Sequence, residues 1–128
     1  MIVVDTSVIA DALVQQPLAD LRRRLAGEVL HAPDLIDHEI VGALRGLALG
    51  RHISAARAQD ALTDYDDLAI RRHASTPGLR ASVWMLRDTM TSYDAAFVVV
   101  ADRLGCPLWT RDRRLASAAR RHVDVEVV

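Results

Sequence analysis

The sequence contains no lysine, since all 16 of its basic residues are arginine. This absence excludes mechanisms that need a lysine, such as P-loop phosphate binding, Schiff-base chemistry and Ser-Lys dyads. A single cysteine, Cys106, permits neither an intramolecular disulfide nor a thiolate zinc cluster, which fits a reducing compartment. No apolar run approaches the roughly 20 residues of a membrane span, and the opening MIVVD lacks the basic start of a signal peptide. We therefore expect a cytoplasmic protein with no membrane partner.

The composition is that of a folded protein. The chain has 128 residues, of which 51% are hydrophobic and 26% charged, and this size fits one compact domain spanning 1–128. Its formal net charge of −1 argues neither for nor against a nucleic-acid partner.

Short β-branched segments alternate with segments of helical periodicity. This order predicts an α/β fold, with a central, mainly parallel sheet sandwiched by helices. Thr6 and Ser7 are expected to cap the first helix, and Ser92 to cap the helix that Gly105 ends. The expected strands are 2–4, 29–31, 70–73, 107–110 and 123–128, and the expected helices are 8–13, 18–26, 34–47, 54–69, 76–90, 92–104 and 112–121.

Four carboxylates stand at unusual positions in this pattern. Asp5 and Asp112 follow two predicted strands, and ligands of open α/β sheets bind beyond the carboxyl ends of the strands. Glu39 lies at the margin of an apolar helix stripe, and Asp94 shares a helix face with apolar residues. All four are therefore candidates for one shielded acidic site.

Each acid also has a purely structural interpretation. Asp5 and Asp112 would serve as helix caps, and Asp94 lies in a first turn where the helix dipole favours an anion. Four converging carboxylates repel one another, however, and no lysine is available to neutralise them. A bound cation is the expected partner, and hard oxygen ligands select Mg²⁺ or Mn²⁺ over zinc.

Three patches of the sequence, in their order, resemble the PIN-domain ribonucleases, in particular the VapC-type toxins of bacterial toxin–antitoxin systems. The patches are IVVDTSVIADAL, DHEIVGALRG and TSYDAAFVVVADRLGCPLWTRDRRLA, and the resemblance covers nearly the whole chain. The third patch is the most specific, because a lone DTS or TRD is common. Phe97 departs from the pattern where many relatives carry tyrosine.

The resemblance implies a metal-dependent endoribonuclease with a PIN-like fold. It implies that Asp5, Glu39, Asp94 and Asp112 hold or orient one or two Mg²⁺ or Mn²⁺ ions, and that the cleaved RNA carries a 5′ phosphate. It also implies supporting polar contacts around the acids, from Thr6, Ser7, Ser92 and Thr110.

Substrate contacts must come from arginine. Arg113 and Arg114 adjoin Asp112 and are expected near the scissile phosphate. Arg80 and Arg87 flank Trp84 on a helix face that would stack bases and bind phosphates. The alternative for this face is a pair of arginines whose stems cover a half-buried tryptophan.

The resemblance further implies two protein partners. One is a VapB-type antitoxin that covers the acidic groove, with an arginine inserted into it. The other is a second copy of the chain, in a homodimer built from the helices between Asp34 and Ala69. The RNA substrate would be of the tRNA or rRNA class.

Other functional classes remain as alternatives or are excluded. A response-regulator receiver and a haloacid-dehalogenase-type phosphatase both need a lysine, and a structure-specific DNA nuclease needs more elements than 128 residues provide. A catalytically inactive PIN-like module that binds RNA or protein stays open, because sequence does not measure turnover. The five histidines show no metal-ligand spacing and are expected at the surface or as caps.

Overall fold

The computed structural model of the chain describes residues 1–15 and 19–128. Within these residues a five-stranded, fully parallel sheet has the strand order β3-β2-β1-β4-β5. The α/β class and the parallel sheet are thus confirmed. The strands are β1 (Ile2–Val4), β2 (Leu30–Pro33), β3 (Ile70–His73), β4 (Leu108–Thr110) and β5 (Val125–Val127).

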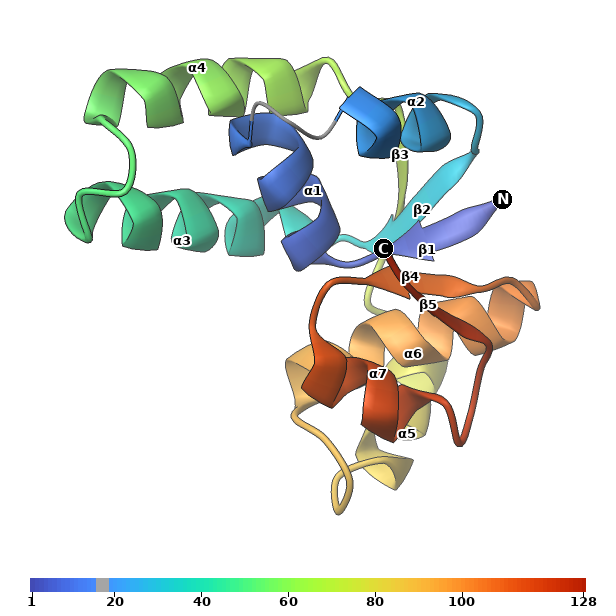
Figure 1. Cartoon of the computed structure of the whole chain (residues 1–128). Coiled ribbons are helices and arrows are strands. Elements are labelled where there is room, and N and C mark those ends of the chain that lie inside the picture. Colours follow the sequence, from blue (N-terminus) through green and yellow to red (C-terminus); the bar gives the residue numbers. More distant parts are fainter. Residues whose placement is uncertain (16–18) are drawn as a thin grey trace.

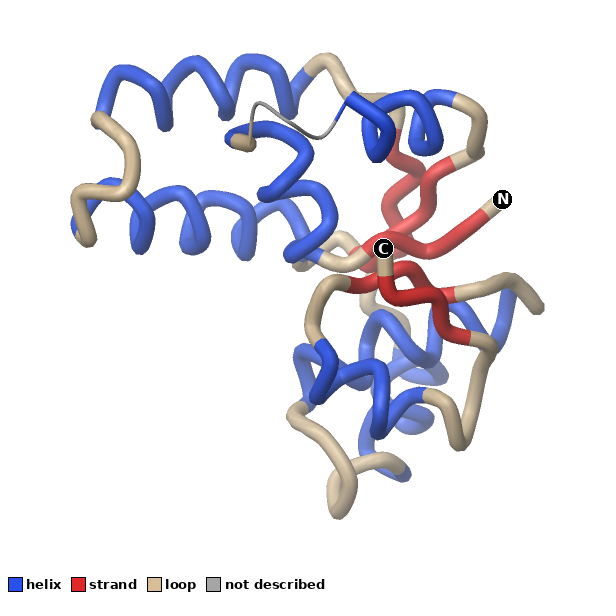
Figure 2. Tube along the Cα trace, viewed as in Figure 1, coloured by secondary structure: helices blue, strands red, loops and turns tan. Residues whose placement is uncertain are grey.

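Helices cover both faces of the sheet. In Figures 1 and 2, α1 to α4 lie on one side of the strands and α5 to α7 on the other. The helices are α1 (Thr6–Val14), α2 (Ala19–Ala26), α3 (Ile36–Leu49), α4 (Ala55–Asp66), α5 (Pro77–Met85), α6 (Ser92–Leu104) and α7 (Arg113–Ala119). The expected start of the second helix at Leu18, like Pro17, lies outside the described residues.

The central strand is β1, and the direction of chain winding reverses beside it. From β1 the chain proceeds through β2 to β3 on one side, and later returns to place β4 and β5 on the other. Loops leaving the carboxyl ends of β1 and β4 therefore diverge onto opposite faces, which is the position where open α/β sheets bind their ligands. The strand residues Val3 and Val4 are fully buried, so this edge has a rigid base.

Helix α6 packs against β1, β2 and β4. Seven consecutive residues, 95–101, are buried in it. Such an unbroken apolar run has no helical periodicity, which is why it resembles a strand in sequence. Gly105 ends the helix in the left-handed conformation, at φ 61°.

The N-caps of two helices differ from the expected residues. Asp5, rather than Thr6 or Ser7, caps α1 and accepts a hydrogen bond from the Val8 amide. Thr91, rather than Ser92, caps α6. Helix α1 therefore begins two residues earlier than expected, at Thr6, whereas α6 begins at Ser92, which is its first helical residue rather than its cap. In both places the cap is the residue whose extended backbone lets its side chain reach the third amide.

Three expected helix boundaries are also wrong. Pro33 belongs to β2, so α3 begins only at Ile36, and α4 ends at Asp66 rather than Ala69. Helix α5 ends at Met85, and the chain continues in turns through the residues expected to complete it. A strand or a turn adjoins the helix at each of these boundaries and takes up residues that were expected to be helical.

His31 is buried, contrary to the expectation of a surface or capping role. Only 4% of it is exposed, and its Nδ1 lies 2.9 Å from Nε2 of His73 on the neighbouring strand. Burial, followed by the charges of His73 and Arg71, lowers its pKa. Within the described residues, Nε2 of His31 has no hydrogen-bond partner.

No helix among the described residues combines the length and the apolar character that crossing a membrane requires.

A polar cluster connects α3, α4 and β3. Tyr65, which is buried, donates its hydroxyl hydrogen bond to Asp37, and Nε of Arg72 donates to the same oxygen over 2.9 Å. Burial opposes ionisation of Asp37, but these two hydrogen bonds outweigh it and its pKa lies below the ordinary value. Burial and the Asp37 hydrogen bond raise the pKa of Tyr65 to about 12.

Replacing Tyr65 by Phe removes the hydroxyl and keeps the buried ring. We expect the free energy of unfolding at neutral pH to fall by about 1 kcal/mol. Because the pKa of Asp37 is lowered, its ionised form stabilises the fold above about pH 4, and this contribution is lost as the pH falls through the folded-state pKa. Urea unfolding at neutral pH and at about pH 3 should show the difference from wild type shrinking in acid. Tyr93→Phe, at an exposed tyrosine, is the matched control, and a difference that persists in acid would contradict this account.

Candidate active site

Asp5 is the buried centre of the acidic site. It follows β1 directly, and only 5% of it is exposed. It accepts hydrogen bonds from the Ser7 hydroxyl (2.6 Å), the Val8 amide (3.1 Å) and the Thr110 hydroxyl. Burial nevertheless raises its pKa, and the nearby Asp112 raises it further. Three donors occupy most of the roughly four lone-pair positions of the carboxylate, so its orientation is well determined.

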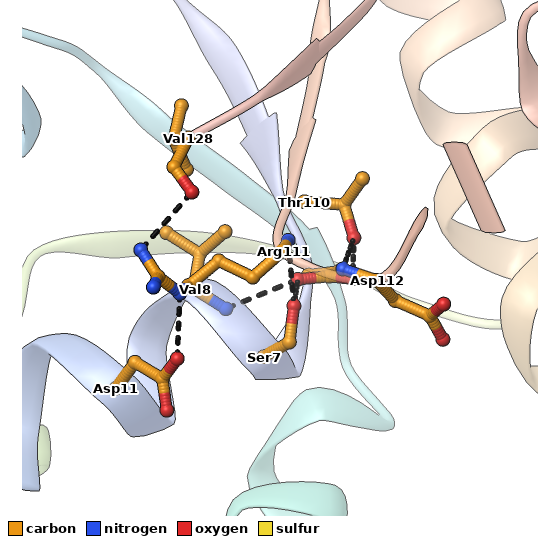
Figure 3. A network of polar contacts seen from close by, with 8 residues as sticks. Ser7, Val8, Asp11, Thr110, Arg111, Asp112 and Val128 are labelled. Carbon is orange, nitrogen blue, oxygen red and sulfur yellow. Dashed lines mark hydrogen bonds and ion pairs between the residues drawn. The ribbon is translucent and has the colours of Figure 1, made fainter. Parts of the chain in front are cut away.

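Two hydroxyl groups connect Asp5 to the loop after β4. The Ser7 hydroxyl accepts from the Arg111 amide (2.9 Å), and the Thr110 hydroxyl accepts from the Asp112 amide (2.9 Å). Figure 3 shows this network, in which both hydroxyls donate to the Asp5 carboxylate and accept from amides of the loop after β4. The carboxyl ends of β1 and β4 are thereby held together.

Asp112 caps α7 and remains exposed to solvent. Its Oδ1 accepts from the amides of Arg114 (2.8 Å) and Leu115 (3.2 Å). Arg111 points elsewhere: it forms an ion pair with Asp11 (2.6 Å) and donates to the Val128 carbonyl. In Figure 3 the Asp112 carboxylate is directed away from this ion pair, so Arg111 does not neutralise it.

Glu39 approaches from α3 and is half-buried. The Thr6 hydroxyl donates to its Oε1 over 2.7 Å. Burial raises the pKa of Glu39, and the charges of Asp94 and Asp5 raise it further. Glu39 is thus electrostatically coupled to two other acids of the site.

Asp94 approaches from the first turn of α6. Burial raises its pKa, and Asp112 raises it further, whereas a hydrogen bond from Thr91 and the charge of Arg114 lower it. Its backbone amide donates to the Thr91 hydroxyl (3.2 Å), which completes the cap of the helix. Helix α6 therefore also contributes a carboxylate to the site.

The structure brings all four predicted acids to one edge of the sheet. Asp112 raises the pKa values of Asp5 and Asp94, and these two acids raise that of Glu39. None of the four forms an ion pair with an arginine in the described part of the chain. Among the described residues, no three histidine, cysteine or acidic side chains are already arranged to hold a metal ion. The chemistry of the donors, which are only carboxylates with hydroxyls behind them, fits Mg²⁺ or Mn²⁺.

Four residues were predicted to make polar contacts with the acids, and three of them do so. Thr6, Ser7 and Thr110 donate hydrogen bonds to Glu39 or Asp5. Ser92 instead lines a neighbouring hollow. Thr91 was missed, although a threonine three residues before an acid at a helix start is a recognisable capping pattern.

The arginines proposed for substrate binding are dispersed. Arg114 lies near enough to Asp94 to lower its pKa, and Arg113 is exposed on the same turn. Arg80 donates to the carbonyl and hydroxyl of Ser75. Arg87 lies beyond the end of α5 and stacks at 4.6 Å on Trp84.

Trp84 is 64% exposed, so the alternative of arginines covering a half-buried tryptophan is wrong. The single helical column expected for these side chains is also absent, because α5 ends before Arg87.

The sequence was compared with known proteins. The PIN domain family model matches residues 2–121. This chain belongs to the PIN-domain family. Ribonuclease VapC9 of Mycobacterium tuberculosis is 38% identical over 128 residues, covering 100% of this chain and 98% of that protein. Ribonuclease VapC12 of the same organism is 35% identical over 129 residues, covering 100% and 99%. Within the PIN-domain family, the chain is therefore a relative of the VapC ribonucleases over its full length.

Solved structures share the PIN fold. PAE2754 from Pyrobaculum aerophilum superimposes with a TM-score of 0.73 at 21% identity, covering 98% of this chain and 83% of that one. VapC20 of Mycobacterium tuberculosis, described as a toxin that cleaves the sarcin-ricin loop, gives a TM-score of 0.65 at 19% identity, covering 92% and 95%. At these identities the likeness concerns the fold alone.

Thr110 offers a test of the hydroxyl network. Thr110→Val removes the donor to Asp5 and the acceptor for the Asp112 amide in a fully buried position. We expect the free energy of unfolding to fall by about 2–4 kcal/mol, because a buried carboxylate oxygen loses its partner. Thr110→Ser keeps the hydroxyl and loses only a methyl group, so it should cost about 1 kcal/mol. Urea unfolding measures both, and equal losses in the two variants would contradict the role of the hydroxyl.

Proposed function

We propose that this PIN-domain protein is a metal-dependent endoribonuclease, the toxin of a type II toxin–antitoxin system, and that it hydrolyses RNA phosphodiester bonds. Its similarity to VapC ribonucleases over the full chain supports the reaction class. The observation that carries the proposal is the convergence of four carboxylates, three of which have raised pKa values, with no arginine ion pair among the described residues. Such a cluster is costly to fold unless a cation binds it.

The four acids would have different roles in metal binding. Asp5, Asp94 and Asp112 would hold Mg²⁺ or Mn²⁺, and Glu39 would bind directly or through water. The bound ion would polarise the phosphodiester, activate a water molecule and stabilise the leaving 3′ oxygen. Ser7 and Thr110 would keep the Asp5 oxygens in place, and Thr6 would do the same for Glu39.

The RNA backbone would contact arginine. Arg114 and the adjacent Arg113 lie on the first turn of α7, beside Asp112, where guanidinium groups would pair with phosphate oxygens. Because the attacking group is water, the reaction needs no 2′-hydroxyl nucleophile, and the product would carry a 5′ phosphate.

The partners follow from the same proposal. A VapB-type antitoxin would cover the acidic site and insert an arginine among the carboxylates. A homodimer would use α3, on which Val41 and Leu49 are exposed. The site of action would be the cytoplasm, on RNA of the tRNA or rRNA class.

Asp94→Asn tests the catalytic site. The amide keeps the size of the side chain and removes a ligand charge, so cleavage of single-stranded RNA should fall by more than about 100-fold. Because the pKa of Asp94 is raised, its ionisation opposes folding, and the variant should melt at an equal or higher temperature than wild type. Asp102→Asn, an exposed acid of the same helix, is the control and should keep its activity. Full activity of Asp94→Asn would overturn the assignment.

Metal binding is testable without RNA. In wild type, Mg²⁺ or Mn²⁺ at about ten times its Kd should add about 1.4 kcal/mol of stability, or about 3–6 °C in melting temperature. Differential scanning fluorimetry measures this shift, with NaCl at equal ionic strength as the control for screening. Asp94→Asn should show a much smaller shift, and an equal shift in the two proteins would place the ion elsewhere.

A further inference from the structure

A small hollow lies beside the acidic site and shares its elements. It has a volume of about 210 Å³ and lies where the chain leaves β2 and β3 and meets α5 and α6. Tyr93, in its wall, directly precedes Asp94. Leu35, also in its wall, accepts the backbone hydrogen bond of Glu39 over 3.1 Å. The hollow thus adjoins two of the acids, one residue from Asp94 along the chain and one helical turn from Glu39.

The residues that line the hollow are suited to contact a flat aromatic ring. Leu79 and Ala96 are buried and Leu35 and Val83 half-buried, which gives the hollow an apolar interior, while Tyr93 is 64% exposed at its edge. Sites for drug-sized ligands measure roughly 300–1,000 Å³, so this one admits a single ring system rather than a whole nucleotide. Unstacked RNA bases are commonly bound between apolar side chains and an aromatic ring.

Two opposite charges also line the hollow: Asp34, which directly follows β2, and Arg80, on α5. Pro33 pairs with His73 in the sheet, so Asp34 and Ser75 leave the sheet next to one another. Arg80 is held there, because its Nη1 donates to the carbonyl (3.0 Å) and hydroxyl (3.2 Å) of Ser75. Asp34 is exposed and forms no ion pair within the described residues. The hollow thus offers a carboxylate acceptor and the remaining donors of a guanidinium.

One base matches this pair of groups. Guanine presents two acceptors, O6 and N7, to an arginine, and two donors, N1–H and the exocyclic amine, to a carboxylate. Adenine places an amine beside N7 and would meet the arginine with a donor. The pyrimidines lack N7 altogether.

From these observations we propose that the hollow binds one unstacked guanine base of the RNA substrate, next to the cleaved phosphodiester. Arg80 contacts the O6/N7 edge, Asp34 accepts from the N1–H edge, and Tyr93 stacks on the ring. The inference rests on the proposed ribonuclease function and adds base selectivity to it. It also gives Arg80 a role distinct from that of Arg114, which would bind phosphate.

Binding of defined oligonucleotides tests this directly. Short oligouridylates carrying a single central G, A, C or U are labelled with a fluorophore, and their Kd values for the full-length Asp94→Asn protein are measured by fluorescence anisotropy. This variant prevents cleavage during the measurement. The guanosine-containing probe should bind at least about fivefold more tightly than the other three. Equal Kd values for the four probes would overturn the proposal.

Second substitutions in the same background separate recognition from general RNA affinity. Arg80→Ala should abolish the preference for guanosine, whereas Arg121→Ala, at an exposed arginine of the α7 end, should keep it. Asp34→Asn should reduce the preference for guanosine, since an amide offers one acceptor and a donor where the carboxylate accepts from both N1–H and the exocyclic amine of guanine. Tyr93→Ala should weaken binding of all four probes, and Tyr93→Phe should restore it. If Arg80→Ala weakens all probes equally, Arg80 contacts phosphate only and the guanine pocket is wrong.

Failure of the pocket and failure of the ribonuclease proposal give different results. If wild type with Mg²⁺ or Mn²⁺ cleaves all four probes at equal rates, the ribonuclease function stands and the pocket is refuted. If the binding preference is present but wild type cleaves no RNA, the pocket stands and the catalytic assignment is refuted.

Discussion

Repulsion between carboxylates is the constraint on which the acidic edge of this sheet depends. Asp5 is nearly inaccessible to solvent, yet it is surrounded by hydroxyl and amide donors rather than by a cation. Those donors offset part of the cost of burial, and the charges of the other acids raise that cost again. A divalent cation would offset the repulsion between the acids, because it binds several carboxylates at once. The acids gather at the carboxyl ends of β1 and β4, where the winding direction reverses, which is where open α/β sheets bind their ligands.

Several arginines of the described residues contact groups other than the four acids and so do not offset the repulsion between those carboxylates. Arg111, although adjacent to Asp112, is paired with Asp11. Arg24 stacks on Trp109 and pairs with Glu126, and Arg87 stacks on Trp84. Guanidinium groups thus stabilise the periphery through stacking and ion pairs, which are individually weak at the surface. The acids retain their negative potential, and Arg114 remains near enough to meet a phosphate.

Local errors in the sequence analysis have a common physical origin. Thr6, Ser7 and Asp5 are all good capping residues, and the choice among them depends on which backbone is extended. The same holds for Thr91 and Ser92. Asp5 is a helix cap and a member of the acidic site at once, so the structural and functional interpretations of this residue do not exclude each other. His31 was misjudged because a histidine in a short strand gives no signal of burial, which only its neighbours across the sheet decide.

The sequence by itself determined the α/β class and the parallel sheet and identified the four acids as candidates for one site, because these follow from alternating apolar segments and from carboxylates placed at strand ends or on apolar helix faces. It also excluded lysine chemistry. Only the tertiary structure decided which hydroxyls support Asp5, which arginines are occupied elsewhere and that Asp34 and Arg80 line one hollow. These relations join residues that are far apart in the chain, and they depend on strand order and register, which no local pattern of residues encodes.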